Sequence, residues 1–123
     1  MRLKPRVRRA LEAALERRTE AAASAHGEAR RTLARRIEAL HHSERALGAA
    51  RDRRYEALGS PGAGWAREAL YRRLETEVAA AAEAKRQAAA ASEAARRHCE
   101  AARRALVDTL VRGRLLRRRL DSP

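Results

Sequence analysis

The stretch GSPGAG, residues 59–64, is the only dense cluster of glycine and proline in the chain. No proline occurs in residues 6–58 or in residues 64–120, so a long helix can run without interruption on each side of it. Gly59 suits the end of a helix, and the Ser-Pro-Gly sequence that follows suits a turn. The pattern predicts one helix over 6–58, a turn over 59–64 and a second helix over 64–120, in a single domain spanning 1–123.

The composition favours a thin helical structure. Charged residues make up 37% of the 123 residues, and more than half of the 45% apolar content is alanine. This mixture is typical of long helices and coiled coils. Because alanine buries little apolar area, a two-layer helical pair is more easily built from this chain than a thick globular core.

Apolar residues recur in both predicted helices at a spacing near 3.5 residues, with a phase shift near residue 30 in the first helix. The predicted seam of the first helix comprises Val7, Leu11, Leu15, Ala22, Ala25, Ala29, Leu33, Ile37, Leu40, Leu47 and Leu58. That of the second comprises Leu70, Leu74, Val78, Ala81, Ala84, Ala88, Ala91, Ala95, Cys99, Ala102, Leu106, Leu110, Leu116 and Leu120. We therefore expect an all-α fold in which the two helices form an antiparallel coiled-coil hairpin.

A turn centred on residues 61–62 sets the expected register of this hairpin. Residue i should then face roughly residue 123 minus i, which pairs large side chains with small or matching ones. One continuous helix in an intermolecular coiled coil is the alternative, and the GSPGAG break argues against it.

The charge is strongly positive and unevenly distributed. The chain carries a net charge of +13, of which residues 1–9 contribute +5 and residues 112–121 contribute +4. Such a balance implies an acidic partner, a nucleic acid or an anionic membrane surface. A hairpin brings both termini to one end, and it places all three aromatic residues, Tyr55, Trp65 and Tyr71, around the turn. Charged termini that merely solubilise the ends are the simpler explanation of the first feature.

The sequence contains little that could carry chemistry. It has no phosphate-binding loop, no metal-binding motif and no nucleophile elbow, so we expect a protein without cofactor that is not an enzyme. The only candidate metal site joins His26, His98 and Cys99 across the hairpin, and surface histidines are the default interpretation. The lone cysteine excludes an internal disulfide. Without a run of about 20 apolar residues or a secretory signal, a cytoplasmic protein is expected.

A short, Arg/Glu/Ala-rich antiparallel hairpin without catalytic motifs resembles the FliJ/YscO family, the central-stalk proteins of flagellar and injectisome type III secretion systems. The resemblance covers the whole chain and is carried by the helix pair 6–58 and 64–120, the basic termini, and YEALGSPGAGWAREALY, residues 55–71. It rests on architecture, since the family has no tight motif. The alanine-rich middle of the second predicted helix departs from the family's pattern.

The resemblance implies a division of roles along the hairpin. The terminal end would enter the pore of a hexameric secretion ATPase, and residues near the turn would contact the cytoplasmic domain of the export gate. The protein would then be cytoplasmic and peripheral to a membrane secretion apparatus. The implied gate contacts are Tyr55, Trp65, Leu70 and Tyr71, which fits the use of tyrosine and tryptophan as interface anchors. The implied pore contacts are Arg2, Arg6, Arg8, Arg9, Arg112, Arg114, Arg117, Arg118 and Arg119.

Two other functions stay open from the sequence. A basic helical nucleic-acid-binding protein would explain the net charge through phosphate contacts, although the basic segments lack aromatic residues for base stacking. A coiled-coil scaffold or adaptor of some other complex is equally compatible with the pattern. For the aromatic residues, the alternative to a binding role is that they cap the seam where the helices separate.

Overall fold

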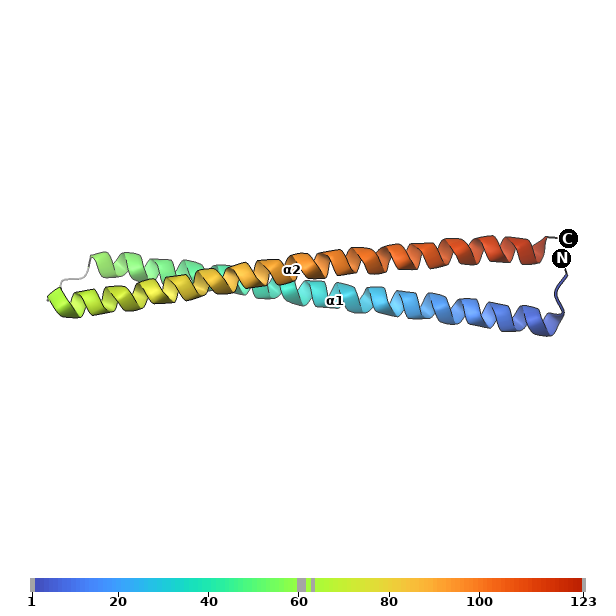
Figure 1. Ribbon diagram of the computed structural model, residues 1–123, viewed down its shortest axis with the longest axis horizontal. Helices are drawn as coiled ribbons and strands as arrows, with labels where there is room; N and C mark the ends of the chain where they lie inside the picture. The colour runs from blue at the N-terminus through green and yellow to red at the C-terminus, as the bar shows by residue number, and fades with distance from the viewer. Residues whose placement is uncertain (1, 60–61, 63, 123) are drawn as a thin grey trace. The chain divides into compact units, whose positions relative to one another are not determined.

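The computed structural model describes residues 2–59, 62 and 64–122. It contains two helices, α1 (Pro5–Leu58) and α2 (Gly64–Asp121), which pack against each other as an all-α helical hairpin (Figure 1). The predicted fold class is confirmed, and the helix bounds differ from the expected ones by a single residue at each outer end. α1 closes with a tight turn in which the Gly59 N–H donates to the Glu56 carbonyl at 3.2 Å. The rest of the predicted turn, residues 60, 61 and 63, lies outside the described residues.

The contacts between residues divide the chain into two compact units. Unit 1 combines the part of the chain up to residue 33 with the part from residue 95 onward, and unit 2 comprises residues 34–94. In each unit a segment of α1 runs antiparallel to a segment of α2 (Figure 1). Unit 1 therefore holds both ends of the chain, and unit 2 holds the connection between the helices.

Residues with reduced exposure recur at alternating spacings of three and four, as in a coiled-coil seam. The α1 series is Glu12, Leu15, Thr19, Ala22, His26, Ala29, Leu33, Arg36, Leu40, Ser43, Leu47, Ala50, Arg54 and Ala57, and only Arg36 is exposed. The α2 series runs in the same way from Tyr71 through Leu74, Ser92, Cys99 and Leu106 to Leu120, and only Lys85 is exposed. The spacing holds through residues 26, 29 and 33, and it is irregular just after them, where Arg36 is exposed and Ile37 is half-buried in its place.

The observed seam contains different residues from the predicted one. Six residues assigned to it from their apolar character are exposed, namely Val7, Ala25, Leu58, Leu70, Ala84 and Leu110. Conversely, Thr19, His26, Ser43, Arg54, Ser92 and Thr109 hold seam positions although they are polar. The reason is geometric: the position of a residue relative to the partner helix decides its burial, whatever its side chain.

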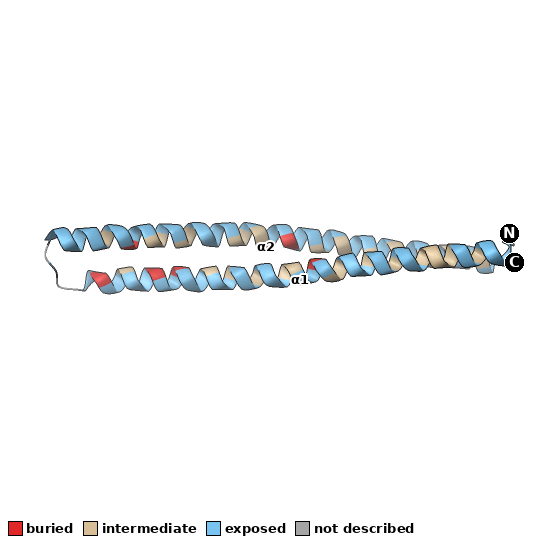
Figure 2. Cartoon of the chain, turned by 90° about the horizontal axis from the view of Figure 1, so that it is seen from below, coloured by how far each residue is buried: buried red, intermediate tan, exposed pale blue. Residues whose placement is uncertain are grey.

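The core is thin and concentrated in unit 2 (Figure 2). Among the described residues, the large side chains of this core are Leu47, which is 4% exposed, and Leu74, which is 7% exposed; the other buried hydrophobic residues are alanines. Unit 1 contributes Ala29 and Ala95 to this core, and none of the described residues in 2–28 and 96–122 is buried. The terminal segments of the hairpin therefore leave their aliphatic side chains partly or largely exposed.

The register of the helices differs from the predicted one by about six residues. Arg8 forms an ion pair with Asp121 in unit 1, and Arg53 lies 3.6 Å from Glu77 in unit 2, so paired residue numbers add up to 129 and 130 instead of 123. The physical reason lies in the seam, because its small alanine side chains specify the register weakly. As a result, the first residues of α2 extend past the end of α1 (Figures 1 and 2). The expectation of a turn centred on residues 61–62 is wrong in this respect.

Candidate protein-binding surfaces

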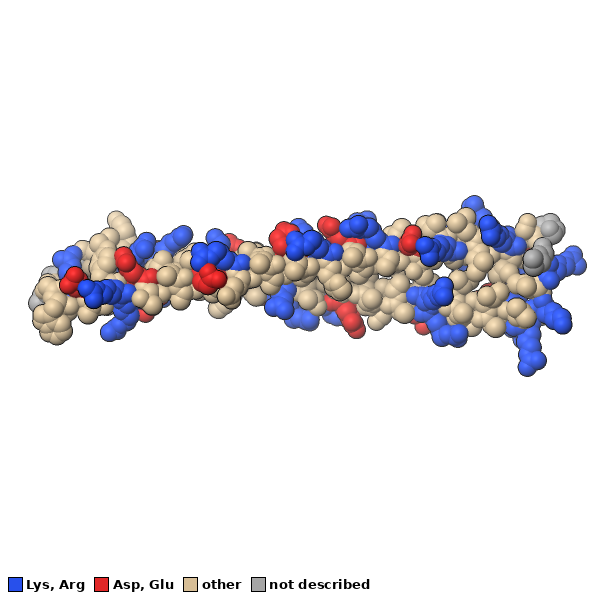
Figure 3. Space-filling model, in the orientation of Figure 1, with Lys and Arg blue, Asp and Glu red and all other residues tan. Residues whose placement is uncertain are grey.

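Basic side chains gather in unit 1, where the two ends of the chain meet (Figure 3). All nine arginines predicted to form a basic cluster belong to this unit, and all but the half-buried Arg8 are exposed: Arg2, Arg6, Arg8, Arg9, Arg112, Arg114, Arg117, Arg118 and Arg119. The hairpin thus joins two modest runs of positive charge, which are separated by about a hundred residues in the sequence, into one surface.

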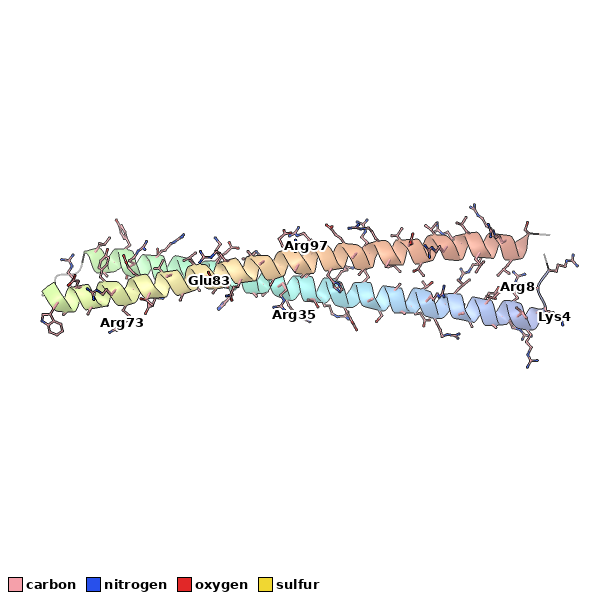
Figure 4. All side chains as sticks on the ribbon, in the orientation of Figure 1. Lys4, Arg8, Arg35, Arg73, Glu83 and Arg97 are labelled. Carbon is pink, nitrogen blue, oxygen red and sulfur yellow. The ribbon has the colours of Figure 1, made fainter. Side chains whose placement is uncertain are left out.

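Arg8 connects the two helices within this cluster. It projects from α1 toward α2 (Figure 4), where its guanidinium donates to Asp121, and its Nε donates to Glu12 at 3.2 Å. The hydrogen bond to Glu12, and then the one to Asp121, raises the pKa of Arg8 above its ordinary value. Arg112 is similarly close to a carboxylate, with Asp108 at 3.5 Å. These two arginines are partly neutralised and contribute less to the positive field than their neighbours.

A groove between the helices of unit 1 takes in two more arginines of the cluster. Arg114 and Arg117 line it from α2, and Glu16 and Glu20 line it from α1. Its floor is formed by Leu15, Thr19, Leu110 and Gly113, and a Cβ added at Gly113 would meet nothing within 4 Å. The helices are therefore loosely packed at this level, and Figure 3 shows the surface hollowed between them. Arg2, Arg6, Arg118 and Arg119 are exposed and lie outside this groove.

The start of α2 forms an overhang, residues 64–70, that has no part of α1 beside it. In the observed register these residues would face positions beyond Leu58, where α1 ends, and all of them are exposed. The long side chain of Arg67 reaches back to α1, where its Nη2 donates to the Leu58 carbonyl at 2.9 Å. Trp65 is consequently 81% exposed and Leu70 40% exposed.

The two tyrosines differ in their surroundings. Tyr55 is 76% exposed near the end of α1, whereas Tyr71 is only partly exposed and occupies the first seam position of α2. Tyr71 also lines a shallow hollow on α2 together with Gly64, Arg67, Glu68, Arg72 and Glu75. Of the four predicted gate contacts, Tyr55, Trp65 and Leu70 offer free surface, and Tyr71 takes part in packing.

The candidate metal ligands do not take the positions across the hairpin that the sequence predicted for them. His26 is half-buried on the seam of α1, His98 is exposed and Cys99 is half-buried. In the register set by Arg8 and Asp121, His26 lies level with residue 103 rather than with residue 97. Within the described part of the chain, no group of three or more His, Cys, Asp or Glu side chains could hold a metal ion.

Sequence reasoning missed one exposed surface on the terminal part of α2. Val107, Val111 and Leu115 are between 48% and 54% exposed and lie off the seam. We call these three residues the outer stripe. Their spacing of four residues is the sequence signal for this surface, and it lies outside the periodicity of the seam.

Comparisons of the chain with protein-family models, with curated proteins and with solved structures give no match. Among the helical residues that the structure describes, no stretch is long and apolar enough to cross a membrane. The surfaces described above are therefore interpreted from their residues alone.

Proposed function

We propose that the chain is a non-enzymatic coiled-coil stalk, which sits in the pore of a hexameric secretion ATPase and links it to the export gate of a type III secretion system. The observation that carries this proposal is the meeting of both basic termini in unit 1, which makes one cationic surface at the ends of the hairpin. A cationic surface of this kind suits an opening lined by negative charge, because it accelerates association and centres the bound chain.

The thin core supports a role in binding other proteins. The chain exposes 9767 Å² of surface, whereas a compact monomer of 13.7 kDa exposes about 6600 Å² by the usual scaling with mass. Such an excess suits a protein that functions by presenting surface to partners. Numerous weak contacts by long arginine side chains also suit a stalk that shifts inside a ring, since each screened pair contributes only about 0–1 kcal/mol.

The overhang supplies the second contact in this proposal. Trp65 and Leu70 project from the overhang, which α1 does not cover, and Tyr55 adds a third exposed side chain in the same unit. Exposed tryptophan and tyrosine are characteristic anchors of protein interfaces. We assign the export-gate contact to these residues, with Tyr71 as part of the packing that positions them.

Charge reversal at the solvent-facing arginines tests the pore contact. The triple variant Arg6→Glu, Arg118→Glu and Arg119→Glu leaves the groove and the Arg8 ion pairs untouched. We expect it to abolish stimulation of nucleotide hydrolysis by a purified hexameric secretion ATPase. The helical circular dichroism signal should persist, since exposed charges near a helix end contribute about 0.3–1 kcal/mol each.

A matched control separates position from total charge. The triple variant Arg45→Glu, Arg51→Glu and Arg73→Glu changes exposed arginines of unit 2 and, like the first variant, lowers the net charge from +13 to +7. Arg73 is labelled in Figure 4. Stimulation should survive in this control. Equal loss in both triple variants would show that only the overall charge matters and would contradict a pore contact at the termini.

The second candidate function is nucleic-acid binding, which the net charge of +13 favours. Each phosphate contact that is replaced by repulsion should lower the salt dependence of binding to duplex DNA. If neither triple variant affects the ATPase while both lose DNA binding at physiological salt, the nucleic-acid function replaces the stalk.

A further inference from the structure

The outer stripe lies on the face of α2 that points away from α1. Val111 is placed two residues after Thr109 and two residues before Gly113, both of which are seam positions. Because successive helical residues are about 100° apart, Val111 lies about 160° from each of them. Val107 and Leu115 are four residues away on either side and share its face. The α1 helix therefore cannot cover these three side chains while the seam holds.

The burial pattern of this region makes the stripe unusual for a charged helix. Val107 is 51% exposed, Val111 48% and Leu115 54%, and none of the described residues in 96–122 is buried. An ordinary outer face of a two-helix coiled coil is polar. Residues four apart form a ridge on a helix surface, and a second helix packs against such a ridge. The three aliphatic side chains of the stripe lie at successive positions of one ridge.

Positive charge surrounds the stripe. Arg103, Arg104, Arg114 and Arg118 are exposed and lie within about 80° of Val111 around the helix axis. Of these four, Arg104 lies 3.9 Å from Glu100. Asp108 also lies about 60° from Val111 and is 3.5 Å from Arg112, so arginines outnumber carboxylates around the stripe. A shallow hollow at one end of the stripe is lined by Arg103, Arg104 and Val107, together with Glu100, Ala105 and Asp108. A partner that covers the stripe must therefore bring carboxylates to its rim.

We propose that the outer stripe is a docking site for an acidic amphipathic helix of another protein, with aliphatic residues facing Val107, Val111 and Leu115 and glutamate or aspartate facing the arginines. A second copy of this chain is disfavoured, because its own arginines would oppose these. An anionic membrane is disfavoured, because interfacial helices bury a large apolar face in the bilayer, and this stripe consists of three side chains. The inference shares Arg114 and Arg118 with the basic cluster, but it differs from the secretion-stalk proposal because it rests on the aliphatic outer stripe of α2, which that proposal does not use.

The test compares two substitutions in the full chain. Val111→Asp puts a negative charge in the stripe, and Ala90→Asp puts the same charge three heptads earlier on the same exposed face of α2, outside the stripe. The probe is a labelled synthetic helical peptide of about 20 residues, long enough to be helical in water. It carries leucines at every fourth position and glutamates on both sides of them. Its twin carries lysine in place of each glutamate, and binding is followed by fluorescence anisotropy.

We expect the acidic peptide to bind the parent chain at least about tenfold more tightly than its basic twin, with a difference that shrinks at high salt. Val111→Asp should weaken this binding at least about tenfold, and Ala90→Asp by less than about twofold. If the aspartate at 111 reduces helicity, the double variant Val111→Ser and Leu115→Ser should weaken binding by the same factor.

Four results would overturn the inference. Equal affinity for the two peptides, or equal loss in the two aspartate variants, would mean that the stripe does not recognise an acidic helix. Binding to phosphatidylserine vesicles that Val111→Asp abolishes, without binding to the acidic peptide, would assign the stripe to a membrane surface. Dimerisation in sedimentation experiments that the same substitution abolishes would assign it to a second copy.

Discussion

Replacing Leu47 by alanine should destabilise the hairpin more than any other single truncation of an aliphatic side chain. Leu47 is 4% exposed and lies in the part of α1 that contributes most of the core. Because the rest of that core is mainly alanine, few neighbouring side chains can fill the space that the substitution leaves.

The expected magnitude follows from the burial. The substitution removes three carbon atoms, each of which contributes about 0.8 kcal/mol when buried, so the transfer term is about 2.4 kcal/mol. A cavity in a globular core would add to this value. Here the seam borders solvent on both sides, so we expect a total of about 2–3 kcal/mol, near the lower end of the range for Leu→Ala.

The matched control is Leu115→Ala, which removes the same atoms from a side chain that is 54% exposed. Leu115→Ala should lower the free energy of unfolding by about half of the transfer term, near 1.1 kcal/mol. The higher helix propensity of alanine offsets a few tenths of a kcal/mol of this loss. The free energy of unfolding is obtained from urea titrations followed by circular dichroism. Amide hydrogen exchange in residues 40–57 should become about fiftyfold faster in Leu47→Ala. An equal loss of stability in the two variants would refute the reasoning that unit 2 holds the core.

Three further outcomes are expected. Gly113→Ala should raise the free energy of unfolding by about 0.5–1 kcal/mol, because the added Cβ meets nothing within 4 Å and alanine has a higher helix propensity than glycine. A loss of stability would mean that the groove closes more tightly in solution. Trp65→Ala should change the free energy of unfolding by less than about 0.5 kcal/mol, because the side chain is 81% exposed. The same substitution should weaken the proposed binding to the export gate. A large drop in melting temperature with intact binding would instead indicate a capping role. The hydrogen bonds from Arg86 lower the pKa of the Glu83 carboxyl. The stabilisation from this pair should therefore be present above the unfolded pKa of Glu83 and be lost as the pH falls through its folded pKa. An NMR titration in which Arg86→Gln leaves the pKa of Glu83 unchanged would contradict this cause.

The number of helices and their bounds were determined by the sequence itself. Helices persist wherever no residue interrupts the backbone hydrogen bonds, and the chain places its one Gly/Pro cluster between two long segments that avoid proline. The meeting of the basic termini followed as well, because a hairpin of two nearly equal helices must return its second end to the first. These features depend on local backbone chemistry and on connectivity, both of which are written along the chain.

The register and the membership of the seam were decided by the tertiary structure. An alanine-rich seam specifies register weakly, since shifting one small side chain past another changes the packing energy little. The observed pairing differs from the predicted one by about six residues, and the overhang at residues 64–70 is a consequence of it. Thr19 and Ser92 became seam residues for the same reason, because the partner helix covers a position and not a residue type.

Whether an aliphatic residue is exposed was also decided only in three dimensions. Leu47 and Leu110 look alike in the sequence, yet Leu47 is 4% exposed and Leu110 is 43% exposed. Two helices offer each other a single stripe of contact, so any aliphatic residue outside that stripe stays uncovered. The sequence shows which side chains prefer burial, and the geometry of the pair determines which of them obtain it and which, as on the outer stripe, are left for a partner.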